Sequence, residues 1–358
     1  MATFSFVYPE ALQFFEIQQD LMPRAEATRV GLQILPNKAT PTFKIRWSQD
    51  DNNYGLMPFR GLNGRPSKLN RLGTNVFEQE PGVYGEFIEL EEQELTERAA
   101  LADITRPIDI SELIFKCNDQ IVQRQAERKE YSVWQLLLYG TYSVPAPGPN
   151  GVEVYTDTYP IQTYIATTPW ASTTTAVPIQ NLQSIQQKWI GHSVLFNEDA
   201  KLYVNQVQAN NLLNNSNAAD FGGRRGMYGA TLNNMVDANN YFRNQKLPTV
   251  EVYDLGFQNQ AVAGVETSTS QYSKFIPNGL GALVGKRTNG APVGNFMDAI
   301  SMQNMQAGMR GSGPYSYVKD YFNGTLAPKE TPGKIEVHRG YSGGPVLTFP
   351  SAVVATTV

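Results

Sequence analysis

The chain has 358 residues, a formal net charge of -4 and a pI near 5.4, with 41% hydrophobic and only 17% charged residues. This length predicts one elongated fold or two to three domains with a real hydrophobic core. The acidic balance argues against tight nucleic-acid binding, which needs clustered Lys and Arg, whereas a polar, weakly charged surface suits extensive protein–protein contact.

Few residues could carry metal or redox chemistry. The single cysteine, Cys117, excludes an internal disulfide framework. His192 and His338 do not belong to a cluster with the ligand spacing of a zinc site. The first residues, MATFSFVYPEAL, lack the basic and apolar regions of a signal peptide. No apolar stretch is long enough for a transmembrane helix. We therefore expect no metal, no cofactor and no membrane contact.

Residues 1–50 are expected to form an N-terminal arm. A short helical piece is predicted around residues 9–21, from its apolar spacing. The segments VGLQILP (30–36) and TFKIRW (42–47) are predicted to be short strands.

Residues 51–107 are expected to form a long excursion in which a basic limb is followed by an acidic limb. The basic side chains of the first limb are Arg60, Arg65, Lys68 and Arg71, and the acidic ones of the second include Glu86, Glu89, Glu91 and Glu92. This order predicts a two-stranded hairpin. It fits either a solvated loop or an extended loop that lies on a neighbouring subunit, because long loops are uncommon in compact domains unless they are functional.

The clearest element is a helix predicted over residues 109–139. Asp109 is expected to cap it and Glu112 to complete a capping box. Its middle is charged, its last turns are apolar around Trp134, and Gly140 is expected to end it. Its length of about 45 Å exceeds a small domain, so we expect a spine along an elongated subunit.

The rest of the chain alternates between short strands and helices. A hairpin is predicted between residues 152–155 and 161–165, a second helix from Pro178, and a third over 198–213 capped by Asn197. Strands are predicted at 249–257, 334–340 and 344–358.

Two glycine-containing motifs could carry chemistry. Residues 340–345, GYSGGP, are similar to the segment around the nucleophile of trypsin-like proteases, with Ser342 in the serine position. Tyr341 stands where that family has Asp, and too little chain follows for a specificity pocket. We interpret the motif as a glycine turn between two strands. Residues 222–226, GGRRG, are not a Walker motif; Arg224 and Arg225 more simply meet a neighbour's carboxylates.

The segment DISELIFKCNDQIVQRQAERKEYSVWQLLLYGTYSV resembles the spine helix of lambda-type tailed-bacteriophage major capsid proteins, the capsid protein E family. The preceding PGVYGEFIELEEQELTE resembles that family's loop-return strand, RGLNGRPSKLN its outgoing limb, and KFIPNGLGALVG its turn before a buried strand. The resemblance runs from about residue 55 to the end and is weakest over 215–330.

The resemblance implies an α+β, Hong Kong 97-like phage capsid fold. The implied division is an N-terminal arm (1–50), an extended loop (51–107), a peripheral domain with the spine helix (108–190 and 331–358) and an axial domain (191–330).

The implied function is that of a major capsid protein, which assembles into hexamers and pentamers of an icosahedral shell around double-stranded DNA. It is no enzyme, and it acts in the virion after assembly in the host cytoplasm. Implied partners are other copies, a portal, a scaffold and a decoration protein, with only weak non-specific contact to DNA.

The expected functional residues fall into three groups. The loop contacts between subunits are Arg60, Arg65, Lys68, Arg71, Glu86, Glu89, Glu91 and Glu92. The spine positions are Asp109, Glu112, Arg128, Glu130 and Trp134, and the axial-loop positions are Arg224 and Arg225. The alternatives are a tail or decoration protein of the virion, or a serine hydrolase that uses Ser342.

Overall fold

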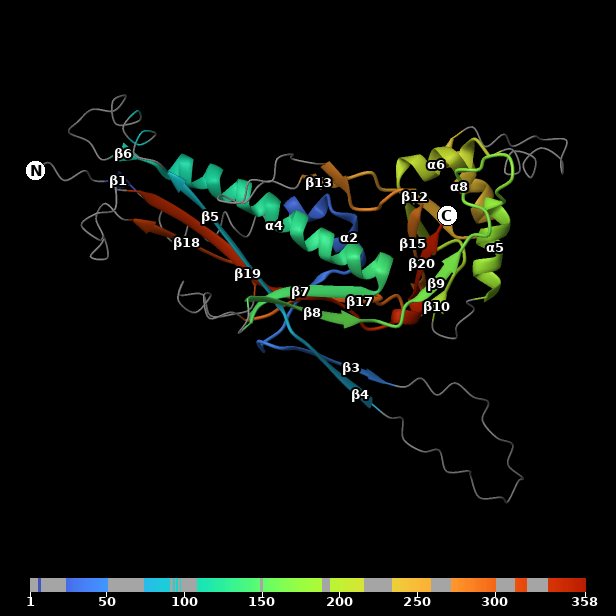
Figure 1. Ribbon diagram of the computed structural model, residues 1–358, viewed down its shortest axis with the longest axis horizontal. Coiled ribbons are helices and arrows are strands. Elements are labelled where there is room, and N and C mark those ends of the chain that lie inside the picture. The colour runs from blue at the N-terminus through green and yellow to red at the C-terminus, as the bar shows by residue number, and fades with distance from the viewer. Residues whose placement is uncertain are drawn as a thin grey trace, which may run out of the picture.

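The computed structural model describes residues 6–7, 24–50, 74–90, 93, 95, 97, 108–148, 151–188, 194–215, 234–258, 272–300, 313–320 and 334–358. It is elongated (Figure 1): one long helix, α4 (Ser111–Tyr139), runs from one end of the body towards a compact group of helices and strands at the other. The helical segment predicted for residues 9–21 lies outside the described residues.

The long helix confirms the strongest prediction, but it begins differently. Residues Ile108–Asp109 form strand β6, paired in parallel with β1 (Phe6–Val7). The helix therefore starts at Ser111, with Ile110 in the cap position and no capping side chain, so the predicted capping box of Asp109 and Glu112 is wrong. Backbone pairing holds Asp109 in a strand and moves the helix start by two residues. The C-terminal end is as predicted, with Gly140 in the left-handed conformation at φ 67°.

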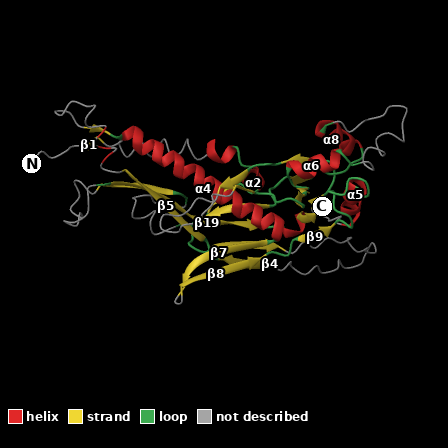
Figure 2. Cartoon of the chain, turned by 45° about the horizontal axis from the view of Figure 1, so that its top comes forward, coloured by secondary structure: helices red, strands yellow, loops and turns green. Residues whose placement is uncertain are grey.

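A sheet under α4 is organised around one long strand, β19 (Ile335–Leu347), and Figure 2 shows the helix lying over these strands. The order is β18-β19-β17-β2, and β5 pairs with β19 as well. The bounds of these neighbours are Tyr315–Asp320 for β18, Gly294–Asp298 for β17, Asn37–Ala39 for β2 and Gly82–Leu90 for β5.

The strand β19 runs without interruption through GYSGGP, so the predicted glycine turn is wrong. Tyr341, Ser342 and Gly343 all pair with residues of β5. Glycine is needed here for close approach rather than for a turn: a Cβ on Gly344 would lie 2.7 Å from the hydroxyl oxygen of Tyr142.

A second five-stranded sheet stands at the other end, in the order β12-β11-β15-β20-β9. Its strands are Thr249–Val252 (β12), Lys201–Val204 (β11), Leu280–Val284 (β15), Val353–Thr357 (β20) and Gln162–Ile165 (β9). The helices around it are α5 (Pro178–Lys188), α6 (Gln206–Leu213) and α8 (Met235–Asn244), and a 3-10 turn, η1 (Pro350–Ala352), precedes β20.

The helix expected from Pro178 is confirmed, but the one expected over 198–213 is shorter. Residues 201–204 form a central strand, and α6 begins after it with Asn205 as its cap, whose Oδ1 accepts a hydrogen bond from the Gln208 amide at 3.1 Å. Asn197 instead accepts from the Asp199 amide in a turn. Three consecutive apolar residues of β11, Leu202, Tyr203 and Val204, are buried in the sheet, and this tertiary packing overrides the helical spacing.

Five two-stranded pairings complete the described part of the fold. The hairpin expected at 152–165 lies one strand earlier, because β7 (Thr141–Gly148) pairs with β8 (Gly151–Thr158). β3 (Ile45–Asp50) pairs with β4 (Thr74–Gln79). The others are β1 with β6, β10 (Val194–Leu195) with β16 (Lys286–Arg287), and β13 (Gly256–Gln258) with β14 (Tyr272–Lys274).

The segment 30–36, expected to be a strand, contains a short helix, α2 (Val30–Ile34). This helix packs against the middle of α4, where its first backbone N–H groups meet a buried carboxylate. The carboxylate that stabilises this short helix belongs to Glu130, about a hundred residues further along the chain. The local sequence therefore does not predict the helix.

The two sheets share one apolar core. A single cluster of buried side chains includes Trp134 and Leu137 of α4 together with Leu202, Leu283 and Val354 of the second sheet. Each sheet also draws strands from both sides of the boundaries expected near residues 190 and 330: β17 and β18 join β19, whereas β9 and β20 join β11.

We predict that Gly140→Ala lowers the free energy of unfolding by about 2–3 kcal/mol, because a Cβ in the left-handed region costs about 1–2 kcal/mol and overpacking adds to it. That Cβ would lie 2.8 Å from Cγ1 of Ile161. Urea denaturation followed by circular dichroism measures the change.

The matched control is Gly290→Ala, at a similar φ of 71° but with no atom within 4 Å of the new Cβ. It should cost only the backbone part, about 1 kcal/mol. Equal losses in the two variants would contradict the proposed crowding at the end of α4.

Candidate functional site

The middle of α4 places a carboxylate inside the protein. Glu130 is fully buried and accepts hydrogen bonds from the amides of Gly31 (2.8 Å) and Leu32 (3.1 Å) and from Nε1 of Trp134 (2.7 Å). It thus satisfies the otherwise unpaired N–H groups at the start of α2. Burial raises the pKa of Glu130 above its usual value, and the donated hydrogen bonds oppose that rise.

The preceding residue, Lys129, is only 1% exposed and joins three segments of the chain. Its Nζ lies 3.1 Å from Oε1 of Glu26 and 3.2 Å from Oδ1 of Asp298, and 5.0 Å from the ring centre of Phe296. Burial raises the pKa of Asp298, although Lys129 acts in the opposite direction. Removing one partner of such a buried pair leaves an uncompensated charge, which costs about 3–5 kcal/mol. Lys129 therefore fixes the N-terminal segment and β17 onto the same point of the helix.

Two arginines of α4, Arg124 and Arg128, face β5. Arg124 and Glu86 form a bidentate pair, with Nε 2.6 Å from Oε2 and Nη2 2.8 Å from Oε1. The guanidinium of Arg128 stands 4.8 Å from the ring centre of Tyr84. These contacts fix β5, the strand that returns from the predicted extended loop, along the helix.

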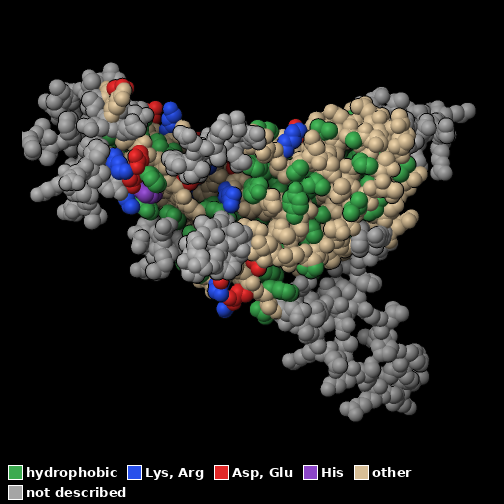
Figure 3. Space-filling model, viewed as in Figure 1, with side chains coloured by type: hydrophobic (Ala, Val, Ile, Leu, Met, Phe, Trp, Pro, Cys, Tyr) green, Lys and Arg blue, Asp and Glu red, His purple; other side chains and the backbone are tan. Residues whose placement is uncertain are grey.

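The outer part of β5 lies beside a mixed patch of charges and rings. Lys334 pairs with Glu89 at 2.6 Å and with Glu336 at 2.7 Å. The ring of His338 is stacked between Phe87 and Tyr317. Figure 3 shows basic, acidic and histidine side chains gathered at this end of the molecule, away from the second sheet.

The hairpin of β3 and β4 leads into and out of residues 51–73, and Figure 1 shows it directed away from the body. It is held to the body by Trp47, whose ring stacks on Phe77 and on Tyr159. Lys44 pairs with Glu78 and Glu80, each at 2.8 Å. Val76 is 72% exposed. The hairpin therefore offers apolar surface that its own chain does not cover.

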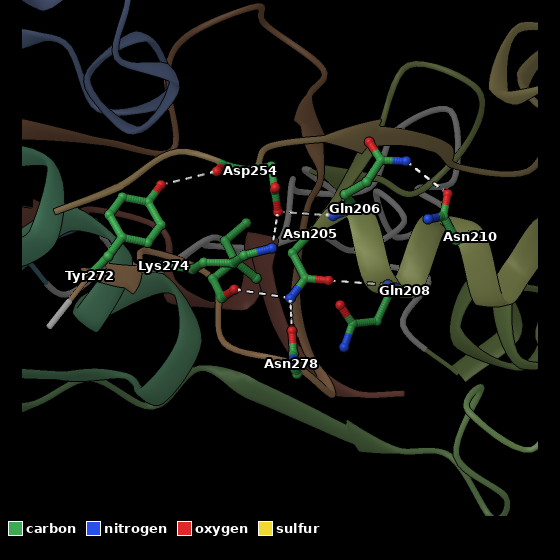
Figure 4. A network of polar contacts seen from close by, with 9 residues as sticks. Asn205, Gln206, Gln208, Asn210, Asp254, Tyr272, Lys274 and Asn278 are labelled. Atoms are coloured by element: carbon green, nitrogen blue, oxygen red, sulfur yellow. Dashed lines mark hydrogen bonds and ion pairs between the residues drawn. The ribbon is translucent and has the colours of Figure 1, made fainter.

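At the far end, a polar network joins the carboxyl ends of the parallel strands β11 and β12 (Figure 4). The buried side chain of Asn205 donates to Oδ1 of Asn278 at 2.7 Å. Asp254 accepts from the Gln206 amide at 3.2 Å and pairs with Lys274 at 2.5 Å. These bonds fix α6 and β14 against the end of the sheet and show no arrangement for catalysis.

The structure describes only some of the residues expected to be functional. Glu86, Glu89, Glu112, Arg128, Glu130 and Trp134 are described, and so is the backbone of Asp109. The others lie outside the described residues: Arg60, Arg65, Lys68, Arg71, Glu91, Glu92, Arg224 and Arg225. Glu86 and Glu89 are brought to one strand, but each already pairs with a cation of its own chain.

The sequence interpretation missed Lys129, Glu26, Asp298 and Arg339 as structural residues. A signal was present for the first of them. Residues 127–130 are four consecutive charged positions, and successive helical residues are 100° apart, so they cannot all face water on a helix covered by a sheet.

The hydrolase interpretation has no geometric support. Ser342 is fully buried in β19, and its Oγ has no hydrogen-bond partner among the residues that the structure describes. Within the described part of the chain, no group of three or more His, Cys, Asp or Glu could hold a metal ion. No described helix has the length and apolar character needed to span a bilayer.

No protein-family model matches the chain, and no curated protein matches its sequence. Among solved structures, it is similar to the proposed capsid protein of a prophage of E. coli CFT073. The identity is 12%, the TM-score is 0.57, and the match covers 96% of this chain and 98% of that one. This likeness shows a shared fold over nearly the full length of both chains.

Two further solved structures are similar at lower scores. One is a phage-related protein from Bordetella bronchiseptica RB50, with 11% identity, a TM-score of 0.49 and coverage of 94% of this chain and 95% of that one. The other is the capsid of an empty GTA particle, with 7% identity, a TM-score of 0.49 and coverage of 92% and 89%. We base the assignment of the fold on the E. coli prophage protein alone.

We predict that Glu130→Gln lowers the free energy of unfolding by about 1–3 kcal/mol, because the new amide nitrogen faces an N–H donor and leaves it unsatisfied. Urea denaturation of wild type and variant at neutral pH, followed by circular dichroism, measures the difference.

Glu127→Gln is the control, one turn earlier on the same helix. Glu127 is partly exposed and pairs with Arg29 at 3.4 Å, so its loss should cost less than about 1 kcal/mol. A Glu130→Gln variant as stable as this control would show that the buried carboxylate does not stabilise α2.

Proposed function

We propose that this chain is the major capsid protein of a tailed bacteriophage, and that its copies form hexamers and pentamers of an icosahedral shell around packaged double-stranded DNA. One observation carries the proposal: the fold matches the proposed capsid protein of an E. coli prophage over 96% of this chain and 98% of the other. Because the match covers nearly all of both chains, the two proteins share their whole fold and not only one small domain. The sequence resemblance to lambda-type capsid proteins points to the same function.

The structural details fit a shell subunit of the Hong Kong 97-like type. The helix α4 spans about 44 Å at 1.5 Å per residue, and a hairpin with exposed apolar side chains extends from one side. We propose that residues 1–50 are the N-terminal arm and 51–107 the extended loop. The sheet of β19 with α4 would form the peripheral domain and the sheet of β11 the axial domain, so that β17 and β18 belong to the former and β9, α5 and β20 to the latter.

The contact between subunits would be made by the extended loop. Arg60, Arg65, Lys68 and Arg71 would meet carboxylates of a neighbouring copy, of which Glu86, Glu89, Glu91 and Glu92 are the candidates. Glu86 and Glu89 already pair with Arg124 and Lys334, so a neighbour's cation would share or displace these partners. Arg224 and Arg225 would contact neighbours near the centre of a hexamer or pentamer.

Several further parts of the proposal follow from this role. The protein would act in the virion without enzymatic activity or a cofactor, after assembly in the host cytoplasm. A portal, a scaffold and a decoration protein are the expected partners, with weak, non-specific contact to DNA. A tail or decoration protein was the other candidate, and no observation on the described residues favours it.

Electron microscopy of the chain co-expressed with its scaffold and portal tests the proposal. We expect closed shells, or sheets and rings with five- and six-fold symmetry. Replacing Arg60, Arg65, Lys68 and Arg71 together by Gln should leave the circular dichroism spectrum unchanged and reduce the yield of shells at least tenfold, because each interface would lose several charge pairs repeated over many copies.

The matched control replaces Lys38, Lys201, Lys246 and Lys286 by Gln, which removes the same charge from exposed positions elsewhere. These variants should keep most of the shell yield. A wild-type chain that stays monomeric with its scaffold and portal would refute the capsid function, whereas normal shells from the loop variant would refute only the role given to the loop.

A further inference from the structure

A buried arginine lies between α4 and the sheet, where its hydrogen bonds go to neutral side chains of the helix. Arg339, on β19, is 1% exposed. Its Nε donates to Oε1 of Gln125 at 2.9 Å, and its Nη1 donates to Oδ1 of Asn118 at 3.2 Å. Both amides belong to α4 and are two turns apart on one face of the helix. Among the described residues, no carboxylate lies within ion-pair distance of this guanidinium.

The one carboxylate that the sheet places next to Arg339 is already engaged. In the sheet register, Arg339 is directly opposite Glu86 of β5 and Ser316 of β18, and directly opposite residues of an antiparallel pair share a face. Glu86 forms its bidentate pair with Arg124 instead. Two arginines therefore compete for one carboxylate, and the more buried of them is left with neutral partners.

The neighbouring charges do not correct this imbalance. Glu26 acts on Arg339 only at a distance and pairs directly with Lys129. Arg128, on the same helix, adds a further cation that stands over the Tyr84 ring. Burial lowers the pKa of Arg339 to about 10, so the group is still charged at neutral pH but is poorly compensated.

The unpaired polar atoms of Arg339 and its two amide partners are all donors. Nη2 of Arg339, Nδ2 of Asn118 and Nε2 of Gln125 are buried and have no hydrogen-bond partner in the described part of the chain. The guanidinium can only donate, so both amides direct their oxygens to it and are left with NH2 groups. Oδ1 of Asn118 also accepts from Ser316 Oγ at 3.4 Å. A water molecule could accept hydrogen bonds from these donors, but its own two O–H groups would then need acceptors. It would also supply no negative charge.

We propose that Arg339, Asn118 and Gln125 form a buried binding site for a small inorganic anion, of which chloride is the type. Such an ion accepts hydrogen bonds in several directions, donates none and supplies the missing negative charge. The bound ion would stabilise the contact between α4 and β19 at Arg339, where β5 and β18 pair with β19 on either side. This inference does not depend on the proposed function, because it concerns the stability of the folded subunit.

The test is the thermal unfolding of the purified full-length chain in sodium chloride and in sodium gluconate at equal ionic strength. Gluconate is too large for a buried site, so its effect measures screening alone. A ligand that binds only the folded state stabilises it by mass action. At a chloride concentration several times the dissociation constant, the stabilisation is about 1 kcal/mol, so the midpoint of this 358-residue chain should be roughly 1–2 °C higher than in gluconate.

Asn118→Asp supplies the negative charge from the protein itself at nearly the same size. We expect this variant to unfold at a higher midpoint than wild type in gluconate and to lose the chloride effect. Gln125→Glu introduces a carboxylate through the other amide and serves if the first variant does not fold.

The matched control is Asn181→Asp. Asn181 is equally a buried asparagine, its Oδ1 accepts from the Tyr164 hydroxyl at 3.1 Å, and its Nδ2 has no partner. No cation contacts it among the described residues, so the new charge should lower the midpoint in both salts and leave the chloride effect intact. Equal midpoints of wild type in chloride and gluconate, or a loss of stability in Asn118→Asp that equals this control, would overturn the proposal.

Discussion

The fold depends on how the charged middle of one long helix is buried. A helix of 29 residues that is covered by a sheet cannot keep four consecutive charged side chains in water. Lys129 and Glu130 are therefore taken inside, and a buried charge is tolerated only with partners. Glu26 and Asp298 supply the counter-charges for Lys129, and the first amides of α2 supply the donors for Glu130. The N-terminal segment and β17 are thus placed by electrostatic need as much as by apolar packing.

The long central strand is the second element on which the arrangement rests. β19 pairs with β5, β17 and β18, and its glycines let neighbouring tyrosine rings approach its backbone. Substitution of Gly344 would bring a Cβ against the Tyr142 hydroxyl. The GYSGGP motif resembles a turn or a catalytic loop, but in this protein its glycines allow neighbouring side chains to pack closely against the strand. Ser342 is buried because it lies within this closely packed strand.

The long helix and the sheet along it extend beyond the shared core. In the proposed shell, these extended parts would make their further contacts with other copies of the chain. The exposed Val76 and the row of rings around His338 lie on parts that extend away from the shared core. Exposed pairs such as Lys44 with Glu78 are individually weak. In the proposed shell, stability would come from the area that many copies bury together rather than from any one pair.

The sequence by itself determined the elements with strong local signals. The helix that ends at Gly140 and the helix from Pro178 follow from periodicity, a left-handed glycine and a proline start, which act within a few residues. The order of basic loop, acidic strand and long helix was also sufficient to suggest the fold that the comparison with the prophage protein supports.

Only the tertiary structure decided the features whose partners are far apart in the chain. Asp109 lies in a strand because Phe6–Val7 pairs with it, residues 30–34 are helical because Glu130 accepts their amides, and residues 201–204 are a strand because two neighbouring strands accept them. The continuous β19 and the lone charge of Arg339 likewise depend on register between distant strands. Local propensity is worth tenths of a kcal/mol per residue, whereas a buried charge or an unpaired backbone group costs several, so the long-range contact decides each case.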